Sequence, residues 1–150
     1  MLISSRIKFF LYLFLIWFLV NLSSLIFRPV LPIDETRYLS VAWEMFVSRE
    51  FIVPHLNGIA YHHKPPLLFW FINLIWLIFG DNEFLTRLVG PFFSFLSLIM
   101  TYLISNKLWK SNNFIFNYSP ILLSCTLIWI FTSSLTMFDT MLTFFTLLAV

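Results

Sequence analysis

FFLYLFLIWFLVNLSSLIF, residues 9–27, is the first long apolar stretch of this sequence, and it closely follows the basic residues Arg6 and Lys8. A helix of about 19 residues is long enough to cross the ~30 Å hydrocarbon core of a bilayer. The stretch lacks the short apolar region and the small-residue cleavage site of a signal peptide. It therefore predicts an uncleaved first transmembrane helix.

The composition of the whole chain indicates the same class of protein. Of its 150 residues, 60% are hydrophobic and 11% are charged, whereas about a quarter of the residues in soluble domains are charged. These values predict an all-α polytopic membrane protein. The net charge of +2 is scattered over short polar segments, which argues against a nucleic-acid partner, because such a partner requires a basic stripe. The single cysteine, Cys125, provides no disulfide framework.

Two later stretches, residues 88–104 and 114–138, are also predicted to span the membrane. Residues 66–79 are apolar too, but a length of about 14 residues is more typical of an interfacial or re-entrant helix. The final stretch, residues 140–150, is apolar and too short to cross a bilayer. We therefore expect these 150 residues to be the N-terminal part of a larger protein.

The lysine and arginine residues predict the topology. Short cytoplasmic loops are enriched in these residues. Arg6 and Lys8 near the N-terminus, and Lys107 and Lys110 in SNKLWKSNN, have no acidic residue beside them. Both segments are therefore expected in the cytoplasm, which requires an even number of crossings between them. Residues 28–87 then form one extracytoplasmic loop, in which the short apolar stretch lies along the outer interface.

This predicted outer loop contains most of the ionisable residues. Six of the seven acidic residues and all three histidines lie between Asp34 and Glu83. Residues 34–50, DETRYLSVAWEMFVSRE, place apolar and polar side chains on opposite faces of a helix. They predict an amphipathic surface helix with Asp34 at its N-cap. Asn57 and Gly58 predict a tight turn in the loop that follows.

Several of these residues also have a purely structural interpretation. Asp34 and Arg37 are three positions apart on the predicted helix, so they could simply form an ion pair. Lys64 could anchor the loop at lipid headgroups, and Arg87, just before a span, could do the same. Asp139 is a stronger functional candidate, because an ionisable group within an apolar membrane segment is costly and usually has a partner or a water-filled cavity.

The order of several motifs resembles a known family. These motifs are LPIDETRY (31–38), AWEMF (42–46), FIVPHLNGIAYHHKPPLLFW (51–70), FGDNEFLTRL (79–88) and FDTMLTFFTLLAV (138–150). Together they resemble the N-terminal part of the bacterial aminoarabinose transferases of lipid A. More broadly, the chain is similar to the polytopic glycosyltransferases of the GT-C fold, which include the protein O-mannosyltransferases. The resemblance covers nearly everything from Pro29 to the end of the sequence.

The resemblance implies an enzyme of the bacterial inner membrane that transfers a sugar, with inversion, from a polyprenyl phosphate carrier to a lipid or protein acceptor at the outer face. It implies that Asp34 is the base for, or positions, the acceptor hydroxyl. Asp139 matches a second aspartate near the site, and Glu35 completes the acidic pair as a further catalytic candidate. Arg37 and Lys64 are expected to bind the departing phosphate, because charged donors stabilise developing negative charge.

Other parts of the resemblance are less specific. Tyr61 and His63 are candidates for substrate contact, although some relatives carry an acidic residue at the position of His63. A divalent cation is a candidate cofactor. Adjacent side chains in an extended segment point to opposite sides, so His62 and His63 are not expected to bind one metal ion together. The family's metal ligands would lie beyond residue 150, and no metal site is assigned.

Two other classes of function are weighed against the enzyme. The first is a non-catalytic membrane interaction protein, or a remnant, derived from such a transferase. The second is a transporter that uses the intramembrane acid. A transporter is disfavoured because the polar residues cluster in one outer loop rather than along a path through the membrane.

Overall fold

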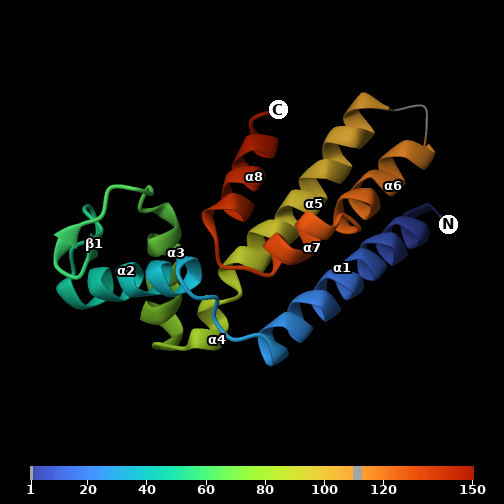
Figure 1. Cartoon of the computed structure of the whole chain (residues 1–150). Helices are drawn as coiled ribbons and strands as arrows, with labels where there is room; N and C mark the ends of the chain where they lie inside the picture. The colour runs from blue at the N-terminus through green and yellow to red at the C-terminus, as the bar shows by residue number, and fades with distance from the viewer. Residues whose placement is uncertain (1, 110–112) are drawn as a thin grey trace.

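The computed structural model describes residues 2–109 and 113–150 and is almost entirely helical (Figure 1). The elements follow one another as α1 (Leu2–Phe27), α2 (Asp34–Ser48), β1 (His55–Leu56), β2 (Ile59–Ala60), α3 (Leu67–Phe79), α4 (Glu83–Thr86), α5 (Val89–Leu108), α6 (Asn113–Ser124), α7 (Leu127–Ser133) and α8 (Phe138–Leu148). The predicted all-α class is confirmed, and the described residues add one short β-hairpin with strands of two residues each. Lys110, in the predicted cytoplasmic loop, lies outside the described residues.

Two of the described helical stretches are long and apolar enough to cross a membrane, Ile7–Phe27 and Glu83–Leu108. They coincide with the first two predicted spans. The 13-residue helix α3 covers the stretch that was expected to be interfacial, and its length corresponds to about 20 Å. That is too short to cross a bilayer, in agreement with the expectation.

The third predicted span, residues 114–138, is not one continuous helix. Helix α6 ends at Ser124 and α7 ends at Ser133, and α7 and α8 meet at an angle of 111°. At the first break the hydroxyls of Ser124 and Thr126 donate to backbone carbonyls three residues earlier. Serine and threonine side chains that bond to the local backbone compete with regular helix continuation. The apolar composition predicted a straight span because it carries no information about these breaks.

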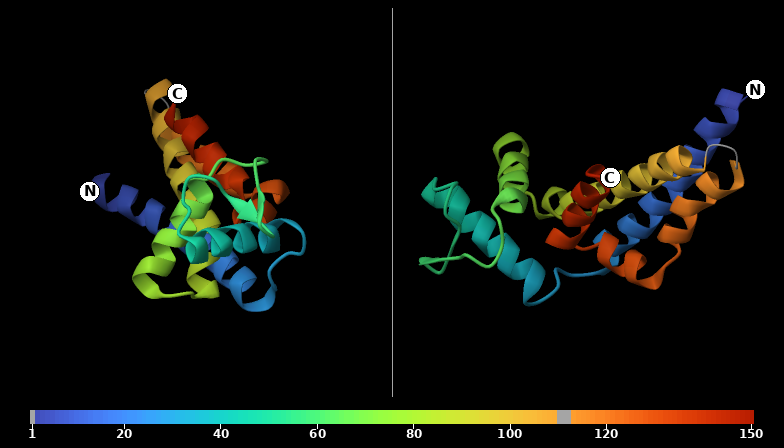
Figure 2. Two further views of the ribbon diagram at one scale, coloured as in Figure 1. Left: turned by 90° about the vertical axis from the view of Figure 1, so that its left-hand side faces the viewer. Right: turned by 90° about the horizontal axis from the view of Figure 1, so that it is seen from above.

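The helices form two groups (Figures 1 and 2). Helices α1, α5, α6 and α7 run side by side with α8 along one flank of α5, whereas α2, the hairpin and α3 lie beyond one end of this bundle. The chain turns at residues 28–33, 80–88 and 134–137 all lie at that same end. The end of the bundle that carries these three turns therefore faces α2, the hairpin and α3.

Packing within the bundle is largely aromatic. Trp17 of α1 donates a hydrogen bond of 2.9 Å from Nε1 to the Ser94 hydroxyl of α5, and its ring lies 4.9 Å from that of Phe95. Phe10 and Tyr102 make an edge contact at 4.8 Å further along the pair. Only 17% of the most apolar 18-residue stretch of α1 is buried within the protein. Such an exposed apolar surface is suited to lipid rather than to water.

Helix α2 packs its apolar face against α3, as its amphipathic sequence predicts. Val41 and Ala42 of α2 are fully buried, as are Leu68, Phe69 and Ile72 of α3. Asp34 is not the N-cap that was expected. Ile33 occupies that position with φ 80°, and Asp34 is the first residue of the helix, with its carboxylate paired to the side chain of Arg37.

The predicted turn at Asn57 and Gly58 is confirmed. Both residues have positive φ, 55° and 75°, and they join strands β1 and β2 as a two-residue hairpin loop. This combination of dihedral angles is the one that matches the twist of two antiparallel strands. Glu44 of α2 accepts a hydrogen bond of 2.7 Å from the Gly58 amide, so the hairpin is attached to α2 and the glutamate is not free in water.

Gly90 is required where α5 meets the turn before α8. A Cβ atom at this position would lie 1.9 Å from the carbonyl oxygen of Leu135. We expect Gly90→Ala to lower the free energy of unfolding by about 1–3 kcal/mol, because the two backbones would have to separate. Thermal unfolding in detergent measures the change. The control is Leu103→Ala, at an exposed position of the same helix, and equal midpoints for Gly90→Ala and the parent would contradict the prediction.

Candidate active site

Three segments that are distant in sequence meet around the ring of Tyr38 in α2. Tyr38 is 4% exposed, and its ring makes an edge contact at 5.1 Å with Phe138, the first residue of α8. Phe69 of α3 lies 5.4 Å from the same Phe138 ring. Lys64, in the loop before α3, places its Nζ atom 5.6 Å from the centroid of that ring. The aromatic contacts thus hold α2, the Lys64 loop and the start of α8 together.

The two aspartates that were singled out from the sequence both lie beside this aromatic cluster. Burial raises the pKa of the Tyr38 hydroxyl above its ordinary value, and the negative charges of Asp34 and Asp139 raise it further. Asp34 lies one helical turn before Tyr38 on α2, and Asp139 directly follows Phe138, whose ring contacts Tyr38, so both carboxylates lie near this ring. Asp139 is exposed in the first turn of α8, where the helix dipole favours a negative charge.

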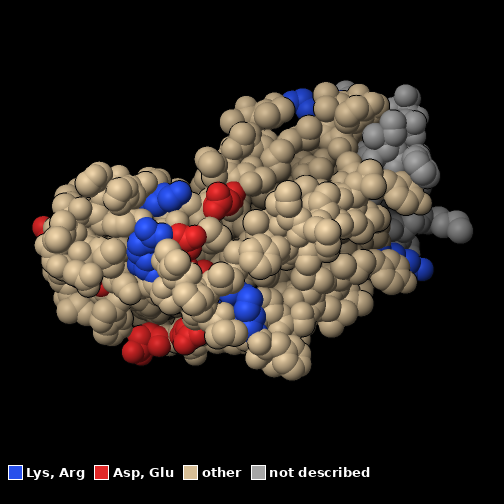
Figure 3. All heavy atoms as spheres, in the orientation of Figure 1, with Lys and Arg blue, Asp and Glu red and all other residues tan. Residues whose placement is uncertain are grey.

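Charges of both signs are neighbours at this junction. Arg37 Nη2 lies 2.5 Å from Asp34 Oδ1, and the two side chains are 36% and 47% exposed. Figure 3 shows basic and acidic side chains next to one another over the start of α2 and the start of α8. On the face shown there, acidic side chains are confined to the part of the molecule that contains α2, α3, α4 and the beginning of α8. Four predicted site residues, Asp34, Arg37, Lys64 and Asp139, are therefore brought to one region.

Tyr61 and His63 lie at the edge of the same region. Tyr61 is 6% exposed, and its ring lies 6.2 Å from Phe69 and 5.4 Å from the imidazole of His63. The expectation that His62 and His63 point to opposite sides is wrong, because their rings stack at 4.9 Å. Within residues 2–109 and 113–150, no three His, Cys, Asp or Glu side chains are grouped so that they could hold a metal ion.

Glu35 does not share the surface of its neighbour Asp34. It is 1% exposed, and Arg28 donates to both of its carboxylate oxygens, at 2.6 Å and 3.3 Å. The backbone amides of Leu31 and Thr136 donate to the same carboxylate at 2.8 Å and 2.7 Å. Burial by itself would raise the pKa of Glu35, but these hydrogen bonds outweigh it and hold the pKa below its ordinary value. The sequence placed Glu35 with the catalytic acids, whereas the fold encloses it.

Arg87 was expected to be an interfacial anchor and is instead buried. Its side chain is 7% exposed, and Nη2 donates to the carbonyl oxygen of Arg28 at 2.7 Å. A second contact, at 3.8 Å, joins it to Glu83. Arg87 therefore fastens the start of α5 to the end of α1. Its place before an apolar stretch could not distinguish this internal role from contact with headgroups.

Sequence reasoning did not identify Tyr38, Phe138 or Arg28 as parts of the site or of its support. Tyr38 and Phe138 belong to motifs that carry the resemblance, LPIDETRY and FDTMLTFFTLLAV, but aromatic residues are too frequent in this chain to stand out. Arg28 follows directly after the first apolar stretch. A basic residue at the predicted outer end of a span is unusual, and this position was the only feature of the sequence that could have pointed to an internal partner for Arg28.

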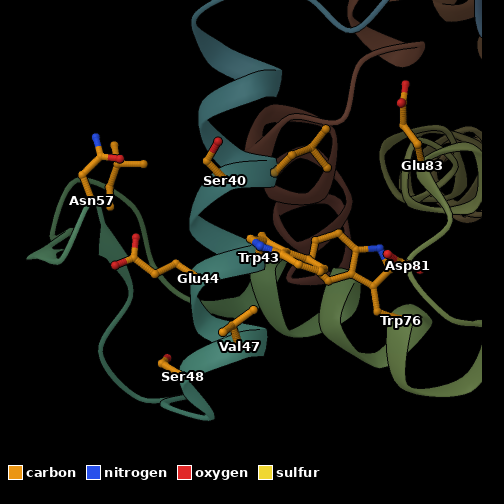
Figure 4. A pocket seen from close by; sticks show the side chains of 11 residues that line it. Ser40, Trp43, Glu44, Val47, Ser48, Asn57, Trp76, Asp81 and Glu83 are labelled. Carbon is orange, nitrogen blue, oxygen red and sulfur yellow. The ribbon is translucent and has the colours of Figure 1, made fainter.

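A separate groove lies on another side of α2 (Figure 4). Its volume is about 670 Å³, and it opens between α2, the hairpin and the corner between α3 and α4. Trp43 and Trp76 form its apolar floor, and Glu44, Asp81 and Glu83 are among its polar residues. None of the predicted site residues lines it. The predicted site residues other than Glu35 therefore lie around Tyr38 and Phe138 and not in this groove.

Comparison with known proteins shows the family to which this chain belongs. The model of the dolichyl-phosphate-mannose-protein mannosyltransferase family matches residues 6–150. The chain belongs to this family. Its similarity therefore extends over both groups of helices and all the residues of the candidate site.

Individual relatives are bacterial transferases. The chain is 36% identical, over 114 residues, to the undecaprenyl phosphate-alpha-4-amino-4-deoxy-L-arabinose arabinosyl transferase of Yersinia enterocolitica, covering 76% of this chain and 20% of that protein. It is also 36% identical, over 116 residues, to transferase 2 of the same name from Proteus mirabilis, covering 77% and 20%. The chain thus spans about a fifth of the length of the curated relatives that it matches.

The fold also matches a solved structure. The crystal structure of ArnT from Cupriavidus metallidurans in the apo state superposes with a TM-score of 0.70 at 20% sequence identity, covering 95% of this chain and 26% of that one. The resemblance to GT-C glycosyltransferases is confirmed at the level of the fold, and the chain is a membrane protein of that class.

The low pKa of Glu35 predicts how stability depends on pH. Because the folded-state pKa lies below the ordinary value of 4.5, the ionised carboxylate stabilises the folded protein fully above pH 4.5. That contribution is lost as the pH falls through the lower, folded-state pKa. The unfolding midpoints of the parent and Glu35→Gln should therefore differ most near neutral pH and converge as the pH falls below 4.5 and through the lower, folded-state pKa of Glu35. A difference that stays constant over this range would contradict the prediction.

Proposed function

We propose that this chain contributes the base and the phosphate-binding cations of a polyprenyl-phosphate-dependent glycosyltransferase. The observation that carries the proposal is the convergence of Asp34, Asp139, Arg37 and Lys64 around Tyr38 and Phe138. An inverting transfer needs a base for the attacking hydroxyl and positive charge for the departing phosphate. The names of the relatives support an undecaprenyl phosphate-linked sugar as the donor.

In the proposed reaction, an acceptor hydroxyl oxygen attacks the anomeric carbon of the donor sugar, and Asp34 takes its proton. The new carbon–oxygen bond forms as the bond to the phosphate oxygen breaks, and the electron pair leaves with the polyprenyl phosphate. Asp34 is suited to the role of base because Arg37 holds one carboxylate oxygen while the side chain remains 47% exposed. Asp139 adds a second negative charge beside the same surface and would position the acceptor or the sugar.

Lys64 and Arg37 are the proposed phosphate contacts. A lysine ammonium acts as a compact point charge, whereas an arginine can bind two oxygens of one phosphate. Lys64 lies over the Phe138 ring and has no carboxylate within ion-pair distance among the described residues. It is therefore the more available of the two cations. Tyr61 and His63 would line the same region and contact the sugar.

We propose that this site faces the outside of the bacterial inner membrane. The turns at 28–33 and 134–137 lie at the same end of the bundle as α2 and α3, and the last turn of α5 and the first turn of α6 lie at the opposite end. With the basic N-terminal segment in the cytoplasm, the site is extracytoplasmic. The acceptor would then be a lipid of the lipid A type or an exported protein.

A non-catalytic membrane interaction protein is the second candidate function. The groove beside Trp43 and Trp76 is the observation that favours it, because open aromatic surfaces are common in binding sites. Transfer of a labelled sugar from a polyprenyl phosphate donor to lipid acceptors, measured with the full-length protein, separates the two candidates. Transfer supports the enzyme, and its absence under conditions where a relative is active favours the alternative.

The proposed base can be tested by Asp34→Asn in the full-length protein. The amide keeps the shape of the side chain and cannot accept the proton, so kcat should fall at least about 100-fold, the lower end of general-base effects. Initial rates of sugar transfer measure the loss. Ser40→Asn, at an exposed position of the same helix, is the matched control. Near-normal kcat for Asp34→Asn would remove it as the base.

The proposed topology can be tested with single cysteines at Asn57 and Lys107, both exposed, in a Cys125→Ser background. In intact spheroplasts, a membrane-impermeant thiol reagent should modify the cysteine at position 57 and reach position 107 only after permeabilisation. The basic residues predict this difference because they stay on the cytoplasmic side. Modification of both positions in intact spheroplasts would show that the topology is wrong.

A further inference from the structure

Glu35 is adjacent to the proposed base in sequence and is excluded from contact with substrate by its surroundings. Its two carboxylate oxygens receive four hydrogen bonds, two from Arg28 and one each from the amides of Leu31 and Thr136. At 1% exposure no surface remains for a substrate atom. A carboxylate with this many charge-assisted and amide donors is held strongly in one position.

The Thr136 bond reaches a distant segment that leads directly into the site. Residues 134–137 form the turn between α7 and α8, and Phe138 and Asp139 follow at once. Arg28 also donates to the Ser134 carbonyl oxygen at 3.1 Å. Both members of the ion pair therefore hold the same turn. Glu35 accepts a hydrogen bond from its Thr136 amide, and Arg28 donates one to its Ser134 carbonyl oxygen.

The same turn is also held by Arg87, just before α5, and by the first residues of α5. The Thr136 hydroxyl donates to the Arg87 carbonyl oxygen at 3.4 Å, and Arg87 in turn donates to the Arg28 carbonyl oxygen at 2.7 Å. Gly90 allows the Leu135 backbone to approach without a side chain between them. The turn is thus enclosed by the end of α1, the start of α2 and the start of α5.

The backbone before α2 is strained where this contact is made. Ile33 has φ 80° and ψ −65°, a conformation that is unfavourable for a β-branched residue, although its side chain is 74% exposed and gains little from packing. The Glu35 bond to the Leu31 amide and the Thr36 amide bond to the Leu31 carbonyl both span this residue. Strain of this kind persists where the surrounding contacts determine the conformation, and it is frequent at functional sites.

We infer that Arg28 and Glu35 are positioning residues that set the location of Asp139 and Phe138 relative to Asp34. We call Arg28, Glu35 and the 134–136 backbone the Glu35 bracket. In this bracket, Glu35 directly follows Asp34 in the sequence, and the 134–136 backbone lies just before Asp139. The inference rests on the proposed function for its consequence in catalysis, whereas the geometric coupling of α2 to α8 is independent of that function.

The inference is tested by measuring the α2–α8 distance and the reaction in the same variants. Spin labels at Val47 and Leu148, exposed positions of α2 and α8, are introduced in a Cys125→Ser background of the full-length protein in nanodiscs. Glu35→Gln presents an amide group to Arg28 and should widen the distance distribution about twofold, because the turn is released from one side. Without the labels, it should lower kcat at least about tenfold while changing the donor KM less than threefold, as expected for misplaced catalytic groups.

Two further variants make the test decisive. Glu44→Gln alters another carboxylate of α2, one that holds only the hairpin, and should leave the distance distribution and kcat unchanged. Arg28→Lys keeps the charge but loses the two-pronged contact, and it should give an intermediate distribution and kcat. It also provides the answer if Glu35→Gln does not yield folded protein.

The outcomes are distinct. An unchanged distance distribution in Glu35→Gln, or in Arg28→Lys when only that variant folds, overturns the inference, whether or not kcat falls. A wider distribution with unchanged kcat overturns the positioning role and leaves a structural contact only. If the parent protein transfers no sugar, the proposed function fails, and the distance measurement alone decides whether the bracket couples α2 to α8.

Discussion

The enclosure of one carboxylate in a mostly apolar chain organises the end of this helical bundle. A buried charge is tolerated only when it is paired and its remaining lone pairs accept hydrogen bonds. Glu35 meets this requirement with Arg28 and the amide of Leu31, which are close to it in sequence, and with the amide of Thr136, about a hundred residues away. Because a separated partner would leave a bare buried charge, the turn before α8 has to stay beside the start of α2.

The candidate site depends on this arrangement in a direct way. Asp34 and Asp139 lie more than a hundred positions apart, and each immediately adjoins a segment held by Glu35. The aromatic contacts of Tyr38 with Phe138 and Phe69 fill the space between α2, α3 and α8. The hydrogen bonds thus fix the orientation of these segments, and the ring contacts bury apolar surface between them. Neither kind of contact by itself would place both the carboxylates and Lys64 on one surface.

The breaks in the third predicted span also help to bring Asp139 towards α2. A straight helix over residues 114–138 would carry Asp139 along its own axis, away from α2. The breaks after Ser124 and Ser133, with the 111° angle between α7 and α8, instead return the chain to α5 and present the first turn of α8 to Tyr38. Irregular backbone is acceptable at such a place because other parts of the protein satisfy it, as Glu35 and Arg28 do for Thr136 and Ser134.

Much of this structure could be predicted from the sequence, and the remainder has an identifiable physical cause. The long apolar stretches, the amphipathic α2, the Asn57-Gly58 turn and the short α3 follow from local composition and spacing, since a bilayer and a helix each impose a fixed length and period. The motifs that carry the family resemblance were also local. The burial of Glu35 and Arg87 and the bend before α8 depend on contacts with residues far away in the chain. The sequence alone thus determined a membrane protein that resembles the GT-C class, together with its candidate polar residues. Only the tertiary structure decided that Glu35 is enclosed while Asp34 stays open to solvent, because the enclosure of Glu35 includes a contact with Thr136, about a hundred residues away.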